Sequence, residues 1–175
     1  QSGSDKILRL MKREYKTTDI LDTLWQIQRI YPSTLIATDI IVGFLEESDK
    51  DFELTYHFLN NAPIYKFHIF RFSPRMNTAA YFMKNRLQEP SSQIKIKRAK
   101  KLSLLGEQKY SIFITKLVAQ TDKALFVGQL KDGFQQALLH NQIPIWVKTS
   151  NNLKGSFAYV KITQLLRGRL LAKLI

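Results

Sequence analysis

The sequence contains no cysteine, so disulfides, thiolate metal sites and cysteine nucleophiles are excluded within its 175 residues. No apolar run approaches the roughly 18 residues that a helix needs to span a bilayer, and no signal peptide is present. An initiating methionine is also missing, because the chain begins Gln1-Ser2-Gly3-Ser4, and we therefore expect the natural start to lie upstream. The lack of disulfides and of targeting segments favours the cytosol.

Acidic residues are scarce in one half of the chain. From Lys84 onward there are 17 Lys and Arg residues against 4 Asp and Glu residues, whereas residues 1–83 contain 10 of each class. The net charge of +13 therefore lies entirely in the second half. This split predicts a polyanionic partner, with nucleic acid ahead of an acidic membrane. The alternative is a solvated basic surface that binds nothing.

Residues 1–83 alternate between helical and strand patterns. The predicted order is a helix from Asp5, a helix from Thr17 to Ile30, a strand at 34–43, a helix after Ser48 and a strand at 65–72. The first strand is apolar and β-branched, which is typical of a strand buried on both faces, so Asp39 within it would need a partner. Helices and strands in this order predict βα units. Two such units cannot close a barrel, and we interpret them as part of a larger α/β domain.

The second half has a different pattern. We place a linking segment at 84–109, with a lysine-rich helix from about Ser92 to Lys109, and, from Tyr110, a region of short strands. The candidate strands are 111–119, 124–129, 134–140, 143–148, 156–163 and 169–174. The separators Asp132-Gly133, Asn151-Asn152 and Arg167-Gly168 have turn chemistry. Residues 110–175 therefore predict a small closed antiparallel β-barrel that is similar to oligonucleotide-binding barrels.

Basic and aromatic side chains interleave along this barrel. Lysines that hold phosphates and aromatic rings that stack on unpaired bases are the usual arrangement for binding RNA loops. The candidate RNA-binding residues are Lys116, Lys123, Lys131, Phe134, Lys148 and Lys154. We expect most of the other aromatic residues, Phe126, Trp146, Phe157 and Tyr159, to fill the barrel core. Phe134, beside Gly133, is the expected exposed stacking residue.

Three ordered segments of the first half resemble the radical-SAM methylthiotransferases. Residues 1–8 (QSGSDKIL) with 11–15 (MKREY) are similar to a family segment that follows a barrel strand. Residues 38–44 (TDIIVGF), followed by Glu47, Ser48, Asp51 and Phe52, resemble the next strand and turn. Residues 67–70 (FHIF), then 73–75 (SPR) with 78–80 (TAA), resemble a third segment. The second half resembles the TRAM domain of the family in its position and strand pattern.

This resemblance implies an α/β fold class, with the C-terminal units of a radical-SAM (β/α) barrel followed by a TRAM-like or OB-like β-barrel. The implied activity is transfer of a methylthio group to C2 of N6-threonylcarbamoyladenosine at position 37 of tRNA, a subgroup favoured by Asp5-Lys6 and by His68-Ile69-Phe70. Enzymes of the family use S-adenosylmethionine and [4Fe–4S] clusters. The cluster cysteines are absent from this chain, so we expect it to be inactive alone.

The implied partner is tRNA, with no DNA and no membrane expected. The alternative function is that of a non-catalytic RNA-binding protein derived from such an enzyme. A basic protein of the membrane surface is disfavoured because an amphipathic anchor is missing.

Ligands of parallel sheets collect at the carboxyl ends of the strands. Together with the resemblance, this gives the cofactor-binding candidates Gln1, Ser2, Gly43, Phe44, Phe70 and Arg75. Polar groups of the cofactor would bond to Gln1 and Ser2, adenine would approach the Gly43 backbone, and Arg75 would hold a carboxylate or phosphate. The family turn Pro-Gly-Glu-Thr is replaced here by residues 45–48 (LEES). We expect a different turn shape, because Glu46 lacks the easy access of glycine to positive φ.

Overall fold

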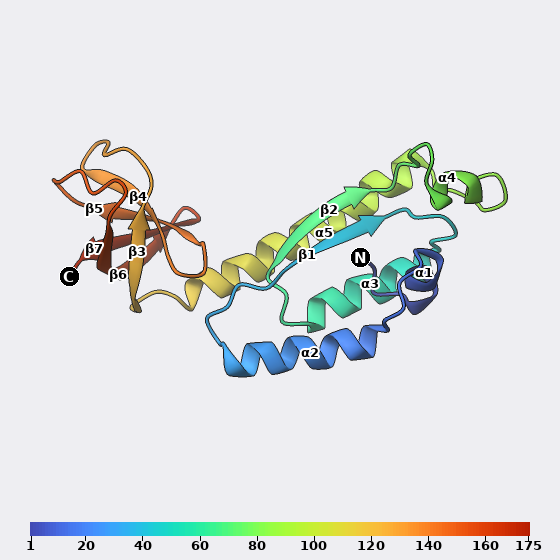
Figure 1. Cartoon of the computed structure of the whole chain (residues 1–175), viewed down its shortest axis with the longest axis horizontal. Helices are drawn as coiled ribbons and strands as arrows, with labels where there is room; N and C mark the ends of the chain where they lie inside the picture. Colours follow the sequence, from blue (N-terminus) through green and yellow to red (C-terminus); the bar gives the residue numbers. More distant parts are fainter. The chain divides into compact units, whose positions relative to one another are not determined.

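The computed structural model describes every residue from Gln1 to Ile175 and divides the chain into two compact units, Gln1–Tyr110 and Ser111–Ile175 (Figure 1). We call the first the α/β unit and the second the barrel unit. No helix has the length and the apolar character that crossing a membrane requires.

The α/β unit confirms the predicted order of helices and strands and adds one short helix. Its elements are α1 (Asp5–Leu10), α2 (Thr17–Ile30), β1 (Ala37–Val42), α3 (Asp49–Asn61), β2 (Lys66–Arg71), α4 (Ala79–Met83) and α5 (Ser92–Thr115), the last of which ends beyond the unit boundary. Strands β1 and β2 pair in parallel, with Asp39 opposite His68 and Ile41 opposite Phe70. The sheet has two strands.

Helices cover only one face of this sheet. The core on that face combines side chains of β1, α3 and α5, namely Ile40, Val42, Phe52, Leu59, Leu102 and Leu105. The other face carries Asp39 and Phe70, and both side chains are exposed. The prediction that the first strand is buried on both faces is therefore wrong, and Asp39 needs no buried partner. A two-stranded sheet with all its helices on one side leaves the alternate residues of each strand open to solvent.

The predicted lysine-rich helix is confirmed as α5, but it continues past Lys109 to Thr115. The strand expected at 111–119 is therefore wrong. Phe113, Ile114 and Leu117 are buried there, and their spacing matches one face of a helical turn as well as it matches a short apolar strand. Periodicity alone did not separate the two possibilities over so few residues.

Basic side chains of α5 bond within the α/β unit. Lys95 pairs with Glu89, Arg98 with Glu47 and Asp49, and Lys101 with Glu53. Lys109 Nζ donates to the carbonyl oxygens of Leu59 and Ala62, at 2.6 Å each, where α3 ends. Burial lowers the pKa of Lys109 to about 8. Much of the positive charge of this helix thus has an internal partner.

The barrel unit confirms the predicted closed barrel. Its strands are β3 (Thr121–Phe126), β4 (Phe134–Leu138), β5 (Pro144–Lys148), β6 (Phe157–Leu166) and β7 (Arg169–Leu174), arranged in the order β3-β4-β5-β7-β6. One detail differs from the prediction, because β5 and β7 pair in parallel while the other pairs are antiparallel.

Two predicted turns of the barrel have the backbone that their residues favour. Asp132 and Gly133 have φ of 52° and 75°, and Arg167 and Gly168 have φ of 48° and 76°. Positive φ at both central residues is the geometry that suits a two-residue hairpin.

The barrel core differs from the prediction in its aromatic content. Phe126 is completely buried, but Phe157 and Tyr159 are 61% and 58% exposed, so the expectation that these two fill the core is wrong. On β6 the inward positions belong to Val160 and Ile162, which are buried. Because strand residues alternate between faces, this register turns Phe157 and Tyr159 outward.

Candidate cofactor cleft and RNA-binding groove

A cleft of about 600 Å³ lies at the carboxyl ends of β1 and β2. Four of the predicted cofactor-binding residues line it, namely Gln1, Phe44, Phe70 and Arg75. They come from separate segments of the sequence, and the parallel pairing of the strands brings these segments to one end of the sheet. The uncovered sheet face contributes Asp39 and Ile41, and further lining residues include Arg13 and Phe72.

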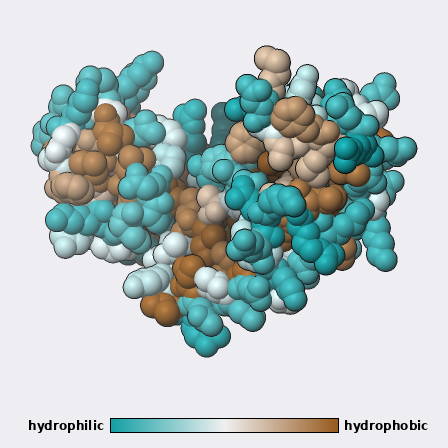
Figure 2. Space-filling view, turned by 45° about the vertical axis from the view of Figure 1, so that its right-hand side comes forward, coloured by the Kyte–Doolittle hydropathy of each residue, from teal (hydrophilic) through white to brown (hydrophobic).

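Hydrogen bonds and ring packing hold two sides of this cleft. The backbone N–H of Ile41 donates to the Gln1 carbonyl at 3.0 Å, and Arg13 donates to the Gln1 side-chain oxygen at 3.1 Å. Phe44 and Phe72 pack edge to face with their ring centroids 4.7 Å apart. Large apolar side chains are exposed on the α/β unit, among them Trp25, Ile30, Phe70, Met76 and Phe82. Figure 2 shows hydrophobic residues on the surface of the molecule.

Ser2 and Gly43 lie outside the lining of the cleft. The Ser2 side chain is buried, shares a hydrogen bond with the Thr55 hydroxyl and accepts one from the Ser4 N–H. Gly43 has φ of 73°, and a Cβ atom there would collide with the Lys95 side chain. Glycine at this position is therefore required by local packing.

The turn after Gly43 keeps a positive φ without a glycine. Glu46 has φ of 60°, so this residue lies in the left-handed region although it has a side chain. Its N–H donates to the Gln88 carbonyl at 2.8 Å, its carboxylate accepts from the Gln88 N–H at 2.6 Å, and its carbonyl accepts from Lys6 at 2.9 Å. These bonds offset the strain that a side chain brings to the left-handed region.

Asp51 ties α1 to the start of α3. Its carboxylate accepts from Ser4 Oγ at 2.8 Å, from Ser48 Oγ at 2.6 Å and from Lys6 Nζ at 2.9 Å, and the predicted capping box with Ser48 is confirmed. Burial alone would raise the pKa of Asp51, but the hydrogen bonds from Ser48, Lys6 and Ser4 outweigh it and lower the pKa to about 2. The carboxylate therefore stays ionised at neutral pH.

A buried ion pair fixes the backbone beside the cleft. Arg98 Nη1 donates to Glu47 Oε2 at 2.6 Å, and Nη2 donates to Asp49 at 2.8 Å. The same Glu47 oxygen accepts from the Gly43 N–H at 2.6 Å. Burial raises the pKa of Glu47, against the hydrogen bond from Gly43 and the charge of Arg98. The hydrogen bonds that Glu47 accepts from Gly43 and Arg98 thus fix the backbone of this turn.

The donors around the cleft suit binding and orientation of a ligand. No group of three or more His, Cys, Asp or Glu side chains converges on a point where a metal ion would sit. Aromatic rings lie beside the cationic side chains Arg13 and Arg75 and the carboxylate of Asp39. This combination matches a ligand with a flat apolar part and charged ends.

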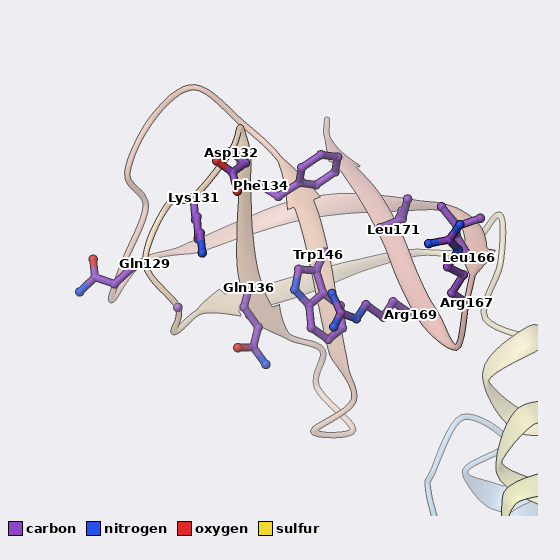
Figure 3. Close-up of a pocket in the computed structure, with 11 residues that line it drawn as sticks. Gln129, Lys131, Asp132, Phe134, Gln136, Trp146, Leu166, Arg167, Arg169 and Leu171 are labelled. Carbon is purple, nitrogen blue, oxygen red and sulfur yellow. The ribbon is translucent and has the colours of Figure 1, made fainter.

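A groove of about 790 Å³ lies on the barrel unit (Figure 3). Its lining includes the predicted residues Lys131 and Phe134 and the basic side chains Arg167 and Arg169. The Arg169 guanidinium lies over the Trp146 ring, 5.1 Å from its centroid, and Figure 3 shows the two side chains side by side. A cation over an indole ring at the edge of a basic groove offers a stacking surface with a charge next to it.

The other predicted RNA-binding lysines are spread over the barrel unit. Lys148 is on β5 and lies opposite Phe134 in the strand register, and Lys123 is on β3 with its ammonium 5.2 Å from the Phe157 ring centroid. Lys154 follows β5 in a loop, and Lys116 follows the end of α5. All four are exposed.

Sequence reasoning missed Trp146, Arg167 and Arg169 as groove residues. Trp146 was assigned to the core, although its place between the buried Ile145 and Val147 turns it outward by strand alternation. The Arg167-Gly168 pair was interpreted only as a turn. Alternation along β5 and β7 is the signal that would have found Trp146 and Arg169, whereas Arg167 lies in the turn before β7.

Comparisons with known proteins place the chain in a family. No family model matches it. A tRNA-2-methylthio-N(6)-dimethylallyladenosine synthase from Thermus thermophilus is 32% identical over 167 residues, which are 94% of this chain and 35% of the relative. A threonylcarbamoyladenosine tRNA methylthiotransferase from Aquifex aeolicus is 39% identical over 129 residues, 74% of this chain and 31% of the relative. The enzyme of that name from Thermotoga maritima is 38% identical over 114 residues, 65% of this chain and 25% of the relative.

The chain combines an α/β unit that has a cleft at the carboxyl ends of its strands with a basic five-stranded barrel. The chain is a homologue of the tRNA methylthiotransferases, which confirms the resemblance seen in its motifs. It spans about a quarter to a third of the length of these curated relatives.

Proposed function

We propose that this chain acts within a tRNA methylthiotransferase, where the barrel unit binds tRNA and the α/β unit provides one wall of the cofactor site. In this proposal the α/β unit is the C-terminal part of a radical-SAM barrel and the barrel unit is its TRAM domain. The observation that carries the proposal is the set of basic side chains around the groove at Trp146 and Arg169, which have no acidic partner. The alternative of a non-catalytic RNA-binding protein is not favoured, because the named relatives are synthases and transferases.

Charge supports the RNA-binding part. Residues 111–175 contain 9 Lys and Arg residues and 2 acidic residues. The carboxylate of Asp122 contacts His140, and no Lys or Arg side chain of this unit is paired with a carboxylate, so every one of them is available to a phosphate. Cations that displace counterions from a nucleic acid give binding that weakens with salt.

The cleft supports the cofactor part, and its lining fits S-adenosylmethionine. The rings of Phe44 and Phe70 would pack on adenine, while Arg75 would bind the carboxylate and Gln1 would bond to polar groups. The bound cofactor supplies radical chemistry, and the residues of this chain would orient it. Ser2 and Gly43 support the site from outside its lining by holding the adjacent backbone.

The [4Fe–4S] cluster does not fit the residues of this chain. Clusters of this kind are held by cysteine thiolates, and the sequence has no cysteine. Its ligands must therefore come from other residues of the full enzyme. We infer that the chain alone binds RNA without catalysing methylthio transfer.

The proposed substrate is N6-threonylcarbamoyladenosine at position 37 of tRNA. Asp5-Lys6 and the strand residues His68-Ile69-Phe70 support this choice. Relatives named for threonylcarbamoyladenosine and relatives named for dimethylallyladenosine both reach 38% and 39% identity, so the proposed choice of substrate rests on these motif residues alone.

A tRNA-binding titration with groove variants tests the proposal. We expect Trp146→Ala or Arg169→Gln to weaken tRNA binding by about tenfold, because each removes a stacking or phosphate contact worth about 1–3 kcal/mol. Lys100→Gln is the matched control, since Lys100 is exposed on α5 in the other unit, and it should bind like the unchanged chain. Equal affinity of all three variants would contradict the groove as the RNA site.

A further inference from the structure

A second surface of the barrel unit exposes two aromatic rings side by side. Phe157 and Tyr159 stand two residues apart on β6, and their side chains are 61% and 58% exposed. Their positions on the strand are roughly 6.6 Å apart, and both point to the outer face of the barrel. Single exposed apolar side chains are common on proteins, but here two exposed rings stand on the same face of one strand. We call Phe157, Tyr159, Lys123 and Lys161 the aromatic strip.

Lysines flank these rings. Lys123 of β3 lies opposite Tyr159 in the antiparallel register, and its ammonium is 5.2 Å from the Phe157 ring centroid. Lys161 follows on β6 and lies opposite Lys173 of β7. The cations therefore lie beside both rings and extend along the strand.

No carboxylate neutralises the strip. The two acidic residues of the barrel unit are Asp122 and Asp132. Asp122 is paired with His140, and Asp132 lines the groove instead. A surface that combines exposed rings with unpaired lysines is complementary to a partner with flat apolar groups and negative charge.

The strip is distinct from the groove. It is built on the adjacent strands β3 and β6, whereas the lining of the groove includes side chains of β4, β5 and β7. Strand β6 changes register against β7 between Ile162 and Gln164. Such an irregularity bends a strand and redirects its side chains, so the start of β6 carries the strip while its last residue, Leu166, lines the groove.

We propose that the aromatic strip binds unpaired nucleotides of RNA by stacking bases on Phe157 and Tyr159, with Lys123 and Lys161 at the adjacent phosphates. Every base has a flat face, so stacking of this kind tolerates any sequence but requires unpaired bases. A base-paired helix keeps its bases inside and offers the lysines only phosphates. This inference rests on the proposed RNA-binding function and adds a second contact site to it.

The test compares two RNA probes with the full chain. The probes are a short single-stranded polyuridine oligonucleotide and a fully base-paired RNA duplex, and affinity is measured by fluorescence anisotropy. The double variant Phe157→Ala/Tyr159→Ala should bind the single strand at least about tenfold more weakly, from the usual size of base–aromatic stacking. Its affinity for the duplex should change by less than about twofold, because the lysines remain.

Conservative variants separate stacking from other roles of the strip. Tyr159→Phe keeps the ring and should bind like the unchanged chain, whereas Phe157→Leu keeps an apolar side chain without a ring and should lose affinity for the single strand. Both side chains are exposed, so each variant should melt at the same temperature as the unchanged chain. Equal melting temperatures would exclude misfolding as the cause of a lost affinity.

The outcomes distinguish this inference from the proposed function. If the unchanged chain binds neither tRNA nor the oligonucleotide, the RNA-binding function itself fails. If the unchanged chain binds both but the double variant binds the single strand equally well, the function stands and the strip is overturned. Equal loss for the single strand and the duplex would also overturn stacking, as would full affinity of Phe157→Leu.

Discussion

Helix α5 and the barrel unit both carry an excess of basic residues, yet the structure uses these residues in different ways. In α5 the cations Lys95, Arg98 and Lys101 pair with acidic residues of the same unit, and Lys109 bonds to backbone carbonyls. In the barrel unit the Lys and Arg side chains form no ion pair. Composition alone therefore overstates the positive charge that the second half presents to a partner, because several of its cations already pair with groups inside the protein.

The comparison also separates two sources of stability. Removing a buried cation of the α/β unit leaves its carboxylate partner buried and uncompensated, which destabilises the fold. Exposed cations of the barrel contribute little to folding and remain available for binding. Four changes test this difference, in order of decreasing effect on stability.

The largest effect is expected from Arg98→Ala. The substitution leaves the Glu47 carboxylate buried without its cation, and breaking a buried pair in this way costs about 3–5 kcal/mol. Chemical denaturation followed by circular dichroism measures the loss in the helical transition. Lys100→Ala on the same helix removes an exposed charge and should change stability by less than about 0.5 kcal/mol. A small effect of Arg98→Ala would contradict the structural role of the α5 cations.

Asp51 makes the stability of the α/β unit depend on pH in the acidic range. Its pKa is lowered to about 2 in the folded chain and is ordinarily about 4 in an unfolded one. The stabilisation is therefore present above about pH 4 and is lost as pH falls toward 2. In Asp51→Asn this part of the acid dependence should vanish, and stability near neutral pH should fall by about 2 kcal/mol through the lost charged hydrogen bonds. If the stability of the unchanged chain and that of Asp51→Asn fall in parallel as the pH is lowered, this role of Asp51 is contradicted.

The turn at Glu46 gives a smaller effect. Both Glu46→Ala and Glu46→Gly remove the side-chain bond to Gln88, but only glycine relieves the positive φ. We expect Glu46→Gly to be more stable than Glu46→Ala by about 1 kcal/mol, measured by thermal unfolding of the two variants side by side. Equal melting temperatures would mean that the backbone at Glu46 is unstrained.

The smallest effect on stability is expected from the barrel. A groove triple variant, Lys131→Gln/Arg167→Gln/Arg169→Gln, removes three charges that make no ion pair. The one stabilising contact that it removes is that of Arg169 over Trp146, worth about 0.5–1 kcal/mol at an exposed site. Stability should therefore fall by no more than about 1 kcal/mol. A loss of stability as large as that of Arg98→Ala would contradict the statement that the barrel cations, unlike those of α5, contribute little to folding.

Much of the fold could be predicted from local patterns. The capping box at Ser48 and Asp51 and the Asp132-Gly133 turn are local signals, and the structure confirms them. The uncovered face of β1 could not be predicted in the same way. An apolar strand has the same sequence whether one or two faces are covered, because the cover comes from distant elements.

The residues of the candidate sites also differ in whether local patterns predict their positions. Gln1, Phe44, Phe70 and Arg75 converge because strand ends gather ligand-binding residues, which the βα order already indicates. The partner of each basic residue on α5 depends on long-range contacts such as Arg98 with Glu47, which no spacing rule contains. The outward direction of Trp146 and Phe157 follows from alternation along β5 and β6, a signal that the prediction of core aromatics did not use.

The most direct test of the account is a salt series of tRNA binding with matched charge variants. The groove triple variant is compared with Lys84→Gln/Lys97→Gln/Lys100→Gln, which removes three exposed charges from the α/β unit. The account predicts that the groove variant binds tRNA much more weakly and that its plot of log affinity against log salt is flatter by about 2. The control variant should follow the unchanged chain. Equal losses of affinity and slope in the two variants would show that tRNA responds to net charge alone, and would contradict the assignment of RNA binding to the barrel unit.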